Sequence, residues 1–381
     1  MSKDRAGRRE FLKSSIAGAG LAALASAGAD AAPAPAPAVP PPAPARAPRL
    51  DFAVIGVNHN HVHRQVEAVV RGGGALVSFF AKEPDLAAAF AKRYPTARLA
   101  RSEKEILESD SIKLVASAGI PVDRAPLGIE VMRHGKDYVS DKPGMISMQQ
   151  LAQVRKVQAQ TRRIYSILYS ELHENRATVK AGELVKAGAI GKVLQTIGIG
   201  PHRLSPSTRP AWFFDKARNG GIICDVGSHQ FDQFLFFTGS RKAEIVAAQV
   251  RESKEHPGLE EFGDVMLRGD GGTGYIRVDW LTPDGLASWG DGRLTVLGTE
   301  GFIEVRKNVD LAGHPGNEHL FIVDGKGTRY LDCKNEPLPY GERLVDDVLN
   351  RTETAMPQEH CFYAMELALR AQQNAKKIAA I

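Results

Sequence analysis

Between residues 50 and 170, short apolar runs alternate with longer stretches in which apolar residues recur at helical spacing. The apolar runs occupy residues 50–56, 75–80, 112–116, 138–141 and 164–169. The helix-like stretches occupy residues 61–70, 85–93, 102–107, 124–134 and 149–160. Strands that alternate with helices form βαβ units, so this part predicts a parallel, doubly wound, Rossmann-like sheet.

After residue 170 the pattern changes to pairs of alternating segments joined by Gly-bearing turns. These turns stand at residues 269–272, 298–301 and 324–327, and they indicate β-hairpins. Helices are expected at residues 176–187, around 230–237 and at 361–380. The predicted fold class is therefore α/β, with an NAD(P)-binding Rossmann-like domain at residues 49–168. A C-terminal α+β domain for substrate binding and oligomerisation follows at residues 169–381, with a large, mostly antiparallel sheet.

The first 48 residues show neither pattern. Residues 8–13 read Arg-Arg-Glu-Phe-Leu-Lys, a twin-arginine signature, and an apolar run of small residues follows at 16–25. We expect a twin-arginine (Tat) signal peptide at residues 1–31 and an Ala/Pro-rich linker at residues 32–48. The prediction is a periplasmic protein, exported by the Tat machinery and without a stable membrane span. The alternative is that the apolar run stays uncleaved as an anchor.

Composition limits the class of partner. Hydrophobic residues make up 43% and charged residues 24% of the chain, which is ordinary for a soluble globular protein. Residues 1–48 hold six basic and three acidic residues, so without them the net charge falls from +5 to +2. No basic stripe with interleaved aromatic residues occurs, and we expect no nucleic-acid partner. The three cysteines lie far apart, which argues against a disulfide framework or zinc site but leaves one bridge open.

The strand predicted at residues 138–141 ends in Asp141-Lys142-Pro143. Proline disfavours a helix at the residue before it, so Lys142 should project from the carboxyl end of the strand. Ligands of open α/β sheets bind at that edge, where a lysine can serve as an acid or a base. Taken alone, the tripeptide also fits a surface turn with a solvated lysine.

The first strand leads into a turn where a dinucleotide fingerprint would read G-x-G-x-x-G. Gly56 is present, but Asn58 and His61 take the places of the other two glycines. Asn tolerates a left-handed backbone, so the turn can still aim backbone N–H groups and a helix N-terminus at a pyrophosphate. We therefore expect Gly56, Asn58, His59 and His61 to contact a cofactor.

Two further features of this half bear on the cofactor and on metals. Ala81 stands where an acid usually binds the ribose of NAD, and the neighbouring Lys82 could meet a 2′-phosphate, which leans slightly toward NADP. The alternative is that Lys82 and Glu83 are simply solvated. His59, His61 and His63 straddle a turn and a helix start, so we expect no metal site.

A second motif occupies residues 219–232, Asn-Gly-Gly-Ile-Ile-Cys-Asp-Val-Gly-Ser-His-Gln-Phe-Asp. On one helix, Asp225 and His229 would be i, i+4 neighbours. An acid beside a histidine tunes the pKa and the orientation of that histidine for proton transfer. The alternative is a helix start with a structural histidine.

Candidate substrate contacts follow the later strands. An aromatic ring with hydrogen-bonding side chains suits a sugar, although such loop residues are as often structural. The candidates are Tyr169, Glu171, His202, Arg203 and Trp212.

Asp-Lys-Pro after a Rossmann-like half, followed by Gly-Gly-x-x-x-Asp-x-Gly-x-His-x-x-Asp in a β-rich half, resembles the Gfo/Idh/MocA oxidoreductase family over residues 50–380. The resemblance implies an NAD(P)-dependent enzyme in which Lys142 and His229 are the acid and base, Asp225 orients or relays, and Asp141 and Pro143 belong to the cofactor site. It also implies a homodimer or homotetramer packed through the open face of the second sheet. Asp141 replaces the usual Glu, and the glycine loop is degraded.

These observations favour a periplasmic oxidoreductase that acts on a sugar, polyol or glycoside hydroxyl. Free nicotinamide nucleotide is scarce outside the cytoplasm, so NAD or NADP should be tightly bound. One alternative is a redox-neutral NAD-dependent glycoside hydrolase or lyase of the same family. Another is a non-catalytic sugar-binding protein on a decayed Rossmann scaffold.

Overall fold

A computed structural model describes residues 48–379. The predicted signal peptide at residues 1–31 and all of the predicted linker except Pro48 lie outside this range. Within it, no helix combines the length and hydrophobicity that a membrane span needs. Cys224, Cys333 and Cys361 are buried and unpaired, so the bridge that the sequence left open does not form in the structure.

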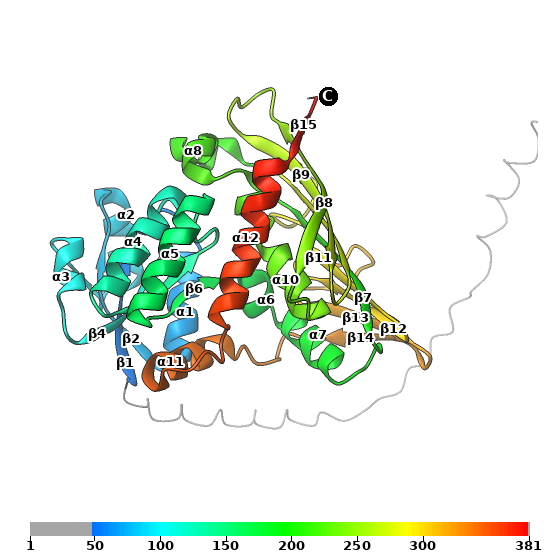
Figure 1. The fold of residues 1–381 in the computed structure, drawn as a ribbon, viewed down its shortest axis with the longest axis horizontal. Helices are drawn as coiled ribbons and strands as arrows, with labels where there is room; N and C mark the ends of the chain where they lie inside the picture. The colour runs from blue at the N-terminus through cyan, green and yellow to red at the C-terminus, as the bar shows by residue number, and fades with distance from the viewer. Residues whose placement is uncertain (1–47, 380–381) are drawn as a thin grey trace, which may run out of the picture. The chain divides into compact units, whose positions relative to one another are not determined.

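Six parallel strands form the first sheet, in the order β3-β2-β1-β4-β5-β6 (Figure 1). They are β1 (Leu50–Ile55), β2 (Gly74–Phe80), β3 (Arg98–Leu99), β4 (Ile112–Ser117), β5 (Asp137–Asp141) and β6 (Tyr165–Leu168). The helices between them are α1 (Val62–Arg71), α2 (Pro84–Arg93), α3 (Glu103–Leu107), α4 (Pro121–Arg133) and α5 (Met148–Thr161). The predicted Rossmann-like sheet is confirmed. Its strand order reverses at β1, the place where such sheets bind ligands.

Local sequence explains where these helices begin. The Ser102 side chain accepts a hydrogen bond from Glu105 N at the start of α3, and Ser147 accepts one from Gln150 N at the start of α5. Each bond satisfies a backbone N–H that has no partner inside the helix.

Nine strands form the second sheet, in the order β14-β13-β12-β11-β7-β10-β9-β8-β15. They are β7 (Val193–Pro201), β8 (Ala243–Glu252), β9 (Glu260–Gly269), β10 (Thr273–Asp279), β11 (Arg293–Gly298), β12 (Gly301–Arg306), β13 (His319–Asp324), β14 (Gly327–Asp332) and β15 (Lys376–Ile378). Only the β7–β10 and β8–β15 pairs are parallel, which confirms the large, mostly antiparallel sheet. The helix predicted to reach residue 380 ends at Asn374, because the chain then joins the sheet edge as β15.

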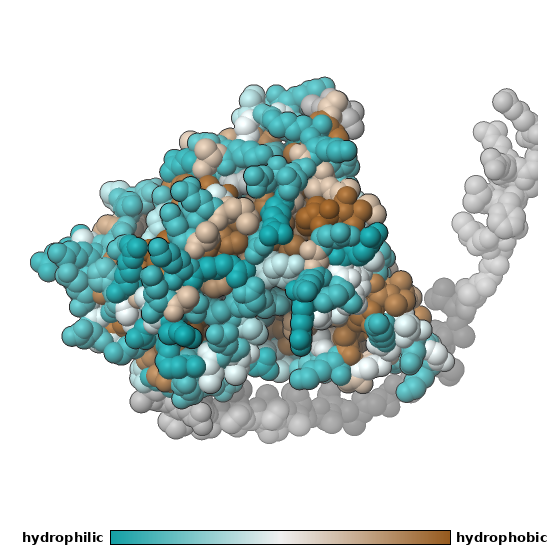
Figure 2. All heavy atoms as spheres, in the orientation of Figure 1, coloured by the Kyte–Doolittle hydropathy of each residue, from teal (hydrophilic) through white to brown (hydrophobic). Residues whose placement is uncertain are grey.

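Helices cover one face of the second sheet. Figure 1 shows α7 (Arg176–Lys186), α10 (Ser228–Thr238) and α12 (Gln358–Asn374) on the side that faces the first sheet. No helix of residues 48–379 lies on the other side in that view. Figure 2 shows hydrophobic atoms gathered over these strands at the right of the view. The exposed apolar side chains of these strands include Leu194, Ile197, Val246, Met266 and Leu297.

The last two helices join both halves. α11 (Tyr340–Asn350) packs against α1, and Leu344 and Val345 belong to the same apolar cluster as β1. Gly341 allows α11 to approach α1 closely, since a Cβ atom on this residue would lie 1.8 Å from the Ala68 carbonyl oxygen. α12 contacts α5 and β6 of the first half and α10 and β8 of the second. The end of the chain thus packs against both halves.

Candidate active site

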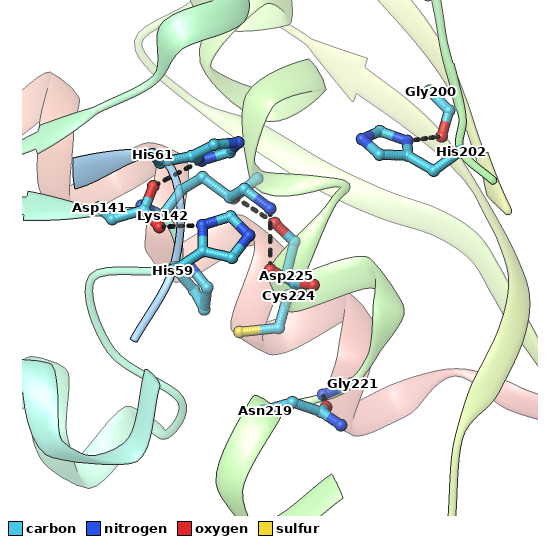
Figure 3. A network of polar contacts seen from close by, with 12 residues as sticks. His59, His61, Asp141, Lys142, Gly200, His202, Asn219, Gly221, Cys224 and Asp225 are labelled. Atoms are coloured by element: carbon cyan, nitrogen blue, oxygen red, sulfur yellow. Dashed lines mark hydrogen bonds and ion pairs between the residues drawn. The ribbon is translucent and has the colours of Figure 1, made fainter. Parts of the chain in front are cut away.

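Asp141, the last residue of β5, is the centre of a buried hydrogen-bond cluster (Figure 3). One carboxylate oxygen accepts bonds from His59 Nδ1 at 2.9 Å and Arg124 Nη2 at 3.0 Å. The other accepts bonds from His61 Nδ1 at 2.9 Å and from the backbone N–H of Lys142 at 2.8 Å. The predicted cofactor loop, with its two histidines, is therefore held against the residue that precedes Lys142.

This cluster fixes which ring nitrogen of His59 and His61 carries a proton. Burial alone would raise the pKa of Asp141, but His61, Arg124 and His59 outweigh it and hold that pKa well below its ordinary value. An ionised carboxylate only accepts hydrogen bonds, so each histidine carries a proton on Nδ1. Burial lowers the pKa of His61 to about 3, which leaves its Nε2 as an acceptor.

The same three side chains have a spacing that a metal ion could use. Ligand atoms of His59, His61 and Asp141 all lie within 4.8 Å of one another. However, each Asp141 oxygen already accepts two hydrogen bonds, and Arg124 adds a buried positive charge beside it. The geometry is that of two histidines, each hydrogen-bonded to the Asp141 carboxylate, rather than of a cation site.

Lys142 projects from the end of β5 toward the second half and is almost fully buried. Its Nζ lies 2.9 Å from Asp225 Oδ1, and the two side chains are only 5% and 16% exposed. Burial alone would raise the pKa of Asp225, but the Lys142 ammonium outweighs this effect and lowers it. Figure 3 shows the pair beside the imidazole of His59. The structure thus brings together two residues that are 83 positions apart.

The two glycines before Asp225 fix its position. Gly221 has φ of +91°, and a Cβ atom there would lie 2.5 Å from the side chain of Gln372. Close approach lets Glu260 accept a bond from Ile222 N and lets Gln372 accept one from Ile223 N. These bonds cap the short helix α9 (Ile222–Asp225), whose last residue is Asp225. The Gly-Gly pair of the motif is required for this cap.

Asp225 and His229 do not lie on one helix, contrary to the prediction. α9 ends at Asp225, and α10 begins at Ser228. Gly227 lies between these two helices, and a Cβ atom there would lie 2.5 Å from the Ile223 carbonyl oxygen. The partner of Asp225 is therefore Lys142, not His229.

His229 still reaches the cavity and is 2% exposed. Its Nδ1 is buried without a hydrogen-bond partner among the described residues. Burial holds the pKa of His229 well below its ordinary value, so the imidazole is neutral at physiological pH. Tyr169, a predicted substrate contact, packs its ring edge-on at 6.3 Å and donates its hydroxyl to the Cys361 carbonyl. Tyr169 is fully buried and supports His229 rather than lining the cavity.

A cavity of about 430 Å³ opens between the two halves in front of Lys142. Its far wall carries a second buried ion pair, between Glu171 and Lys307, and Gln230 Nε2 donates to Glu171 at 2.7 Å. Burial opposes ionisation of Glu171, but Lys307 prevails and lowers its pKa to about 2. Glu171 was predicted to contact substrate and does line the cavity. Lys307 was not predicted, because nothing in the local sequence links it to a residue 136 positions away.

His202 and Arg203 also line the cavity, as expected for substrate contacts. His202 Nδ1 donates to the Gly200 carbonyl at 2.9 Å, so Nε2 is free to accept; in Figure 3 this ring edge faces Lys142 and Asp225. Burial lowers the pKa of His202 to about 4. Arg203 is largely engaged, since its Nη2 donates to the carbonyls of Pro283 and Leu286.

The aromatic wall differs from the prediction. Trp212 is buried and packs beside Phe213 rather than lining the cavity. Its place is taken by Phe213 and by two tryptophans from loops after β10, Trp280 and Trp289. A tryptophan within a four-residue turn of helix gives no signal in the sequence about which side it faces.

A separate groove of about 480 Å³ runs along the ends of β1, β2 and β4. Gly56 has φ of +81°, and a Cβ atom there would lie 3.0 Å from Gly119 Cα, so the turn after β1 favours glycine at this position. Asn58 lines the groove and donates to Glu83 Oε1 at 2.9 Å. Lys82 also lines it, 72% exposed and 3.4 Å from Glu103.

This groove suits a dinucleotide. It lies at the carboxyl ends of parallel strands, where open α/β sheets bind dinucleotides, and Gly56 and Asn58 line it at the turn that leads to α1. Two predicted cofactor residues, His59 and His61, line the Lys142 cavity instead of the groove. Asp141 and Pro143 line neither the cavity nor the groove. Asp141 orients both histidines, and the Pro143 carbonyl accepts a hydrogen bond from Arg124 at 3.1 Å. Arg124, which sequence reasoning missed, is 1% exposed and ties these elements together.

Comparisons with known proteins agree with this fold. Residues 178–304 match the model of the GFO/IDH/MocA C-terminal domain. The chain is 42% identical to a putative oxidoreductase from Erwinia carotovora atroseptica SCRI1043, with a TM-score of 0.84, over 87% of this chain and 100% of that one. No curated protein matches the chain.

More distant structures share the fold. The 3-ketoreductase KijD10 from Actinomadura kijaniata, in complex with NADP and TDP-benzene, has a TM-score of 0.70 at 16% identity, over 87% of this chain and 99% of that one. An oxidoreductase from Agrobacterium radiobacter in complex with NAD+, L-tartaric acid and magnesium has a TM-score of 0.71 at 14% identity, over 86% and 97%.

Proposed function

The chain belongs to the Gfo/Idh/MocA family of NAD(P)-dependent oxidoreductases, and we propose that it interconverts a hydroxyl and a carbonyl on a sugar, polyol or glycoside. The observation that carries this proposal is the buried Lys142–Asp225 pair, which faces a polar cavity next to the dinucleotide groove. Family membership favours this enzyme over the non-catalytic sugar-binding alternative.

Nicotinamide, when bound, supplies or accepts the hydride. The chain's own residues handle the proton: the Lys142 ammonium gives it to the carbonyl oxygen during reduction, and oxidation is the reverse, in which the neutral amine takes the proton of the substrate hydroxyl. Asp225 stabilises the ammonium form at 2.9 Å. His229, kept neutral by burial, orients the substrate oxygen by a hydrogen bond. Gly56, Asn58 and Lys82 line the groove that would hold the dinucleotide, and His59 and His61 face the Lys142 cavity, where the nicotinamide would lie. Asp141 and Pro143 would act indirectly, by fixing the histidines and Arg124.

The cofactor preference rests on the end of β2. Lys82 is exposed in the groove and offers a positive charge to a 2′-phosphate, whereas the nearby carboxylate of Glu83 already accepts from Asn58. We therefore retain NADP as the proposed preference. Lys82→Ala should weaken NADP binding more than NAD binding, and equal effects on both nucleotides would contradict this preference.

The test of the function starts with the purified protein. Mass spectrometry of released nucleotide identifies a retained cofactor, and nicotinamide absorbance then reports turnover on a panel of sugars and polyols. Lys142→Ala should lower kcat by roughly 10²- to 10⁴-fold while nucleotide binding persists. Lys92→Ala, at an exposed position of α2, is the matched control. Full activity in the Lys142 variant would overturn the assignment.

The same assays separate net oxidation from the redox-neutral alternative. Net oxidation changes nicotinamide absorbance in proportion to product. A glycoside hydrolase or lyase cycle would release product sugar with no lasting change in that absorbance. A tightly held nucleotide would suit either reaction.

We further propose that the protein is periplasmic. The twin-arginine signature at residues 8–13 and the small-residue run at 16–25 support this proposal. Replacing Arg8 and Arg9 by lysine should move the full-length protein from the periplasmic to the cytoplasmic fraction. An unchanged distribution would contradict the proposal.

We propose that the open face of the second sheet joins copies into a homodimer or homotetramer. The strand registers align Met266, Tyr275, Ile197 and Thr295 in one row across this face. Met266 is 53% exposed and Ile197 37%, which is typical of a surface that a partner covers.

A further inference from the structure

One arginine of the cavity has no counter-ion. Arg209 follows a short turn after β7 and lines the cavity together with Phe213 and Trp280. Its Cζ lies 4.6 Å and 5.3 Å from the centres of those two rings. Nε donates to the Leu204 carbonyl and Nη2 to the Arg203 carbonyl, so two of its five N–H groups are used. In residues 48–379, no carboxylate oxygen lies within 4.0 Å of this guanidinium.

The other cations of the cavity are compensated. Lys142 pairs with Asp225 and Lys307 with Glu171. Arg203 lies 3.4 Å from Asp284. Arg64, at the opposite end, shares its part of the cavity with Glu174 and Glu318. Burial raises the pKa values of both carboxyls, and Arg64 only partly opposes this effect.

Charge is therefore distributed unequally along the cavity. The end near Arg64 is mixed in sign, whereas the end formed by Arg209, His202 and the aromatic rings contributes positive charge without an acid of its own. The nearest acid to influence Arg209 is Asp225, which is already engaged by Lys142. The guanidinium is partly buried, and this burial lowers the pKa of Arg209, so an anion beside it would stabilise the charged form.

We propose that Arg209 binds a carboxylate of the substrate, and hence that the substrate is an acidic sugar or sugar acid, such as a hexuronate or an aldonate. This inference rests on the proposed oxidoreductase function. The sugar ring or chain would lie along Phe213, Trp280 and Trp289, with the reacting hydroxyl toward Lys142. His202 Nε2, the acceptor that faces the cavity, suits a further hydroxyl of the same molecule.

A carboxylate fits this site better than a phosphate ester. The guanidinium fork matches the two oxygens of a carboxylate with parallel hydrogen bonds. One uncompensated cation balances the single charge of a carboxylate, whereas a phosphate monoester carries nearly two charges and calls for further donors. The neighbouring Arg203 has committed its Nη2 to backbone carbonyls and does not supply them.

The test compares acidic sugars with their neutral counterparts on cofactor-loaded, full-length protein. Calorimetric titration uses D-glucuronate and D-gluconate against D-glucose, D-galacturonate and D-galactonate against D-galactose, and D-glucose 6-phosphate. We expect at least one acid to bind the wild type more than 10-fold tighter than its neutral counterpart. Arg209→Gln should weaken that binding roughly 10- to 100-fold, the range for a hydrogen-bonded charged group. Arg209→Lys, which keeps the charge, should retain part of it.

Arg241→Gln is the matched control, because Arg241 is exposed and lies outside the cavity. Unfolding midpoints without ligand identify any variant that has lost its fold. If Arg209→Gln is such a variant, binding of the acid by Arg209→Lys decides the test instead. The proposal is overturned if every acid binds no better than its neutral counterpart, if Arg209→Gln keeps the preference, or if only the phosphate is preferred.

The proposed function fails differently. Nicotinamide absorbance is followed in the same mixtures. An acid that binds through Arg209 without any change of nicotinamide would count against the oxidoreductase assignment alone. Turnover of neutral sugars only, unaffected by Arg209→Gln, would count against the carboxylate site alone.

Discussion

Replacing Asp225 by Asn tests the ion pair at the centre of the site. The change keeps the shape of the side chain but leaves the Lys142 ammonium, 5% exposed, without its counter-charge. At the observed separation of 2.9 Å, two unit charges interact with about 6 kcal/mol in an effective dielectric of 20, which is a ceiling because both groups lose hydration. Breaking a buried pair by removing one partner typically costs about 3–5 kcal/mol, and we expect Asp225→Asn to lower the free energy of unfolding by that amount.

The pH dependence gives a second readout. The pKa of Asp225 is lowered in the folded protein, so its stabilising effect is complete above the ordinary value of 3.8 and is lost as the pH falls through the folded value. The difference between wild type and Asp225→Asn should therefore be largest near neutral pH. It should shrink in acid.

Urea unfolding followed by circular dichroism measures both effects. Lys142→Met and the double variant complete a cycle, in which the two single changes should be strongly non-additive. Glu108→Gln is the control, because Glu108 and Lys104 form an exposed pair at 3.5 Å whose loss should cost about 0.5 kcal/mol or less. A loss below about 1 kcal/mol for Asp225→Asn, or additive single changes, would refute the description of a desolvated pair.

Three further outcomes follow from the same structure. Lys307→Met should remove the stability that the wild type gains from the ionised Glu171. The pKa of Glu171 is lowered from 4.5 to about 2, so this gain is complete above pH 4.5 and is lost toward pH 2. The unfolding curves of the two proteins should therefore converge in acid. Gly221→Ala should cost about 1–3 kcal/mol from backbone strain alone, with added contact against Gln372, whereas Gly285→Ala, in open space, should change the urea midpoint little. Ile197→Asp should shift the protein toward the monomer in analytical ultracentrifugation, and an unchanged mass would argue against the open sheet face as the interface.

Most of the first sheet could be predicted because its strands and helices carry their own local patterns; the two-residue edge strand β3 is too short to show one and was not predicted. Lys142 could be placed for the same reason: Pro143 and the strand before it fix where it projects. The pairing of Lys142 with Asp225 was less accessible. Helical spacing suggested a partnership of Asp225 with His229, whereas in the structure the helix is interrupted between them, at Val226 and Gly227.

For other residues of the site, the direction of the side chain could not be predicted from the sequence. Tyr169 directly follows β6 and Trp212 lies in the loop region after β7, yet both rings are buried instead of lining the cavity. Lys307 and Arg124 became visible only through long-range contacts, with Glu171 and Asp141 respectively. Both are buried charges, and a sequence read alone places most such residues on the surface.

The way the last two helices close both halves has a consequence for synthesis on the ribosome. β1 and α1 are synthesised early, but part of the apolar cluster that buries them is formed by Leu344 and Val345 of α11. The Gln372 that caps α9 arrives only with α12. A growing chain therefore holds an incompletely covered Rossmann-like sheet until nearly all of it has been made. Completion of the fold, and with it the seating of Asp225 against Lys142, should coincide with release of the finished polypeptide.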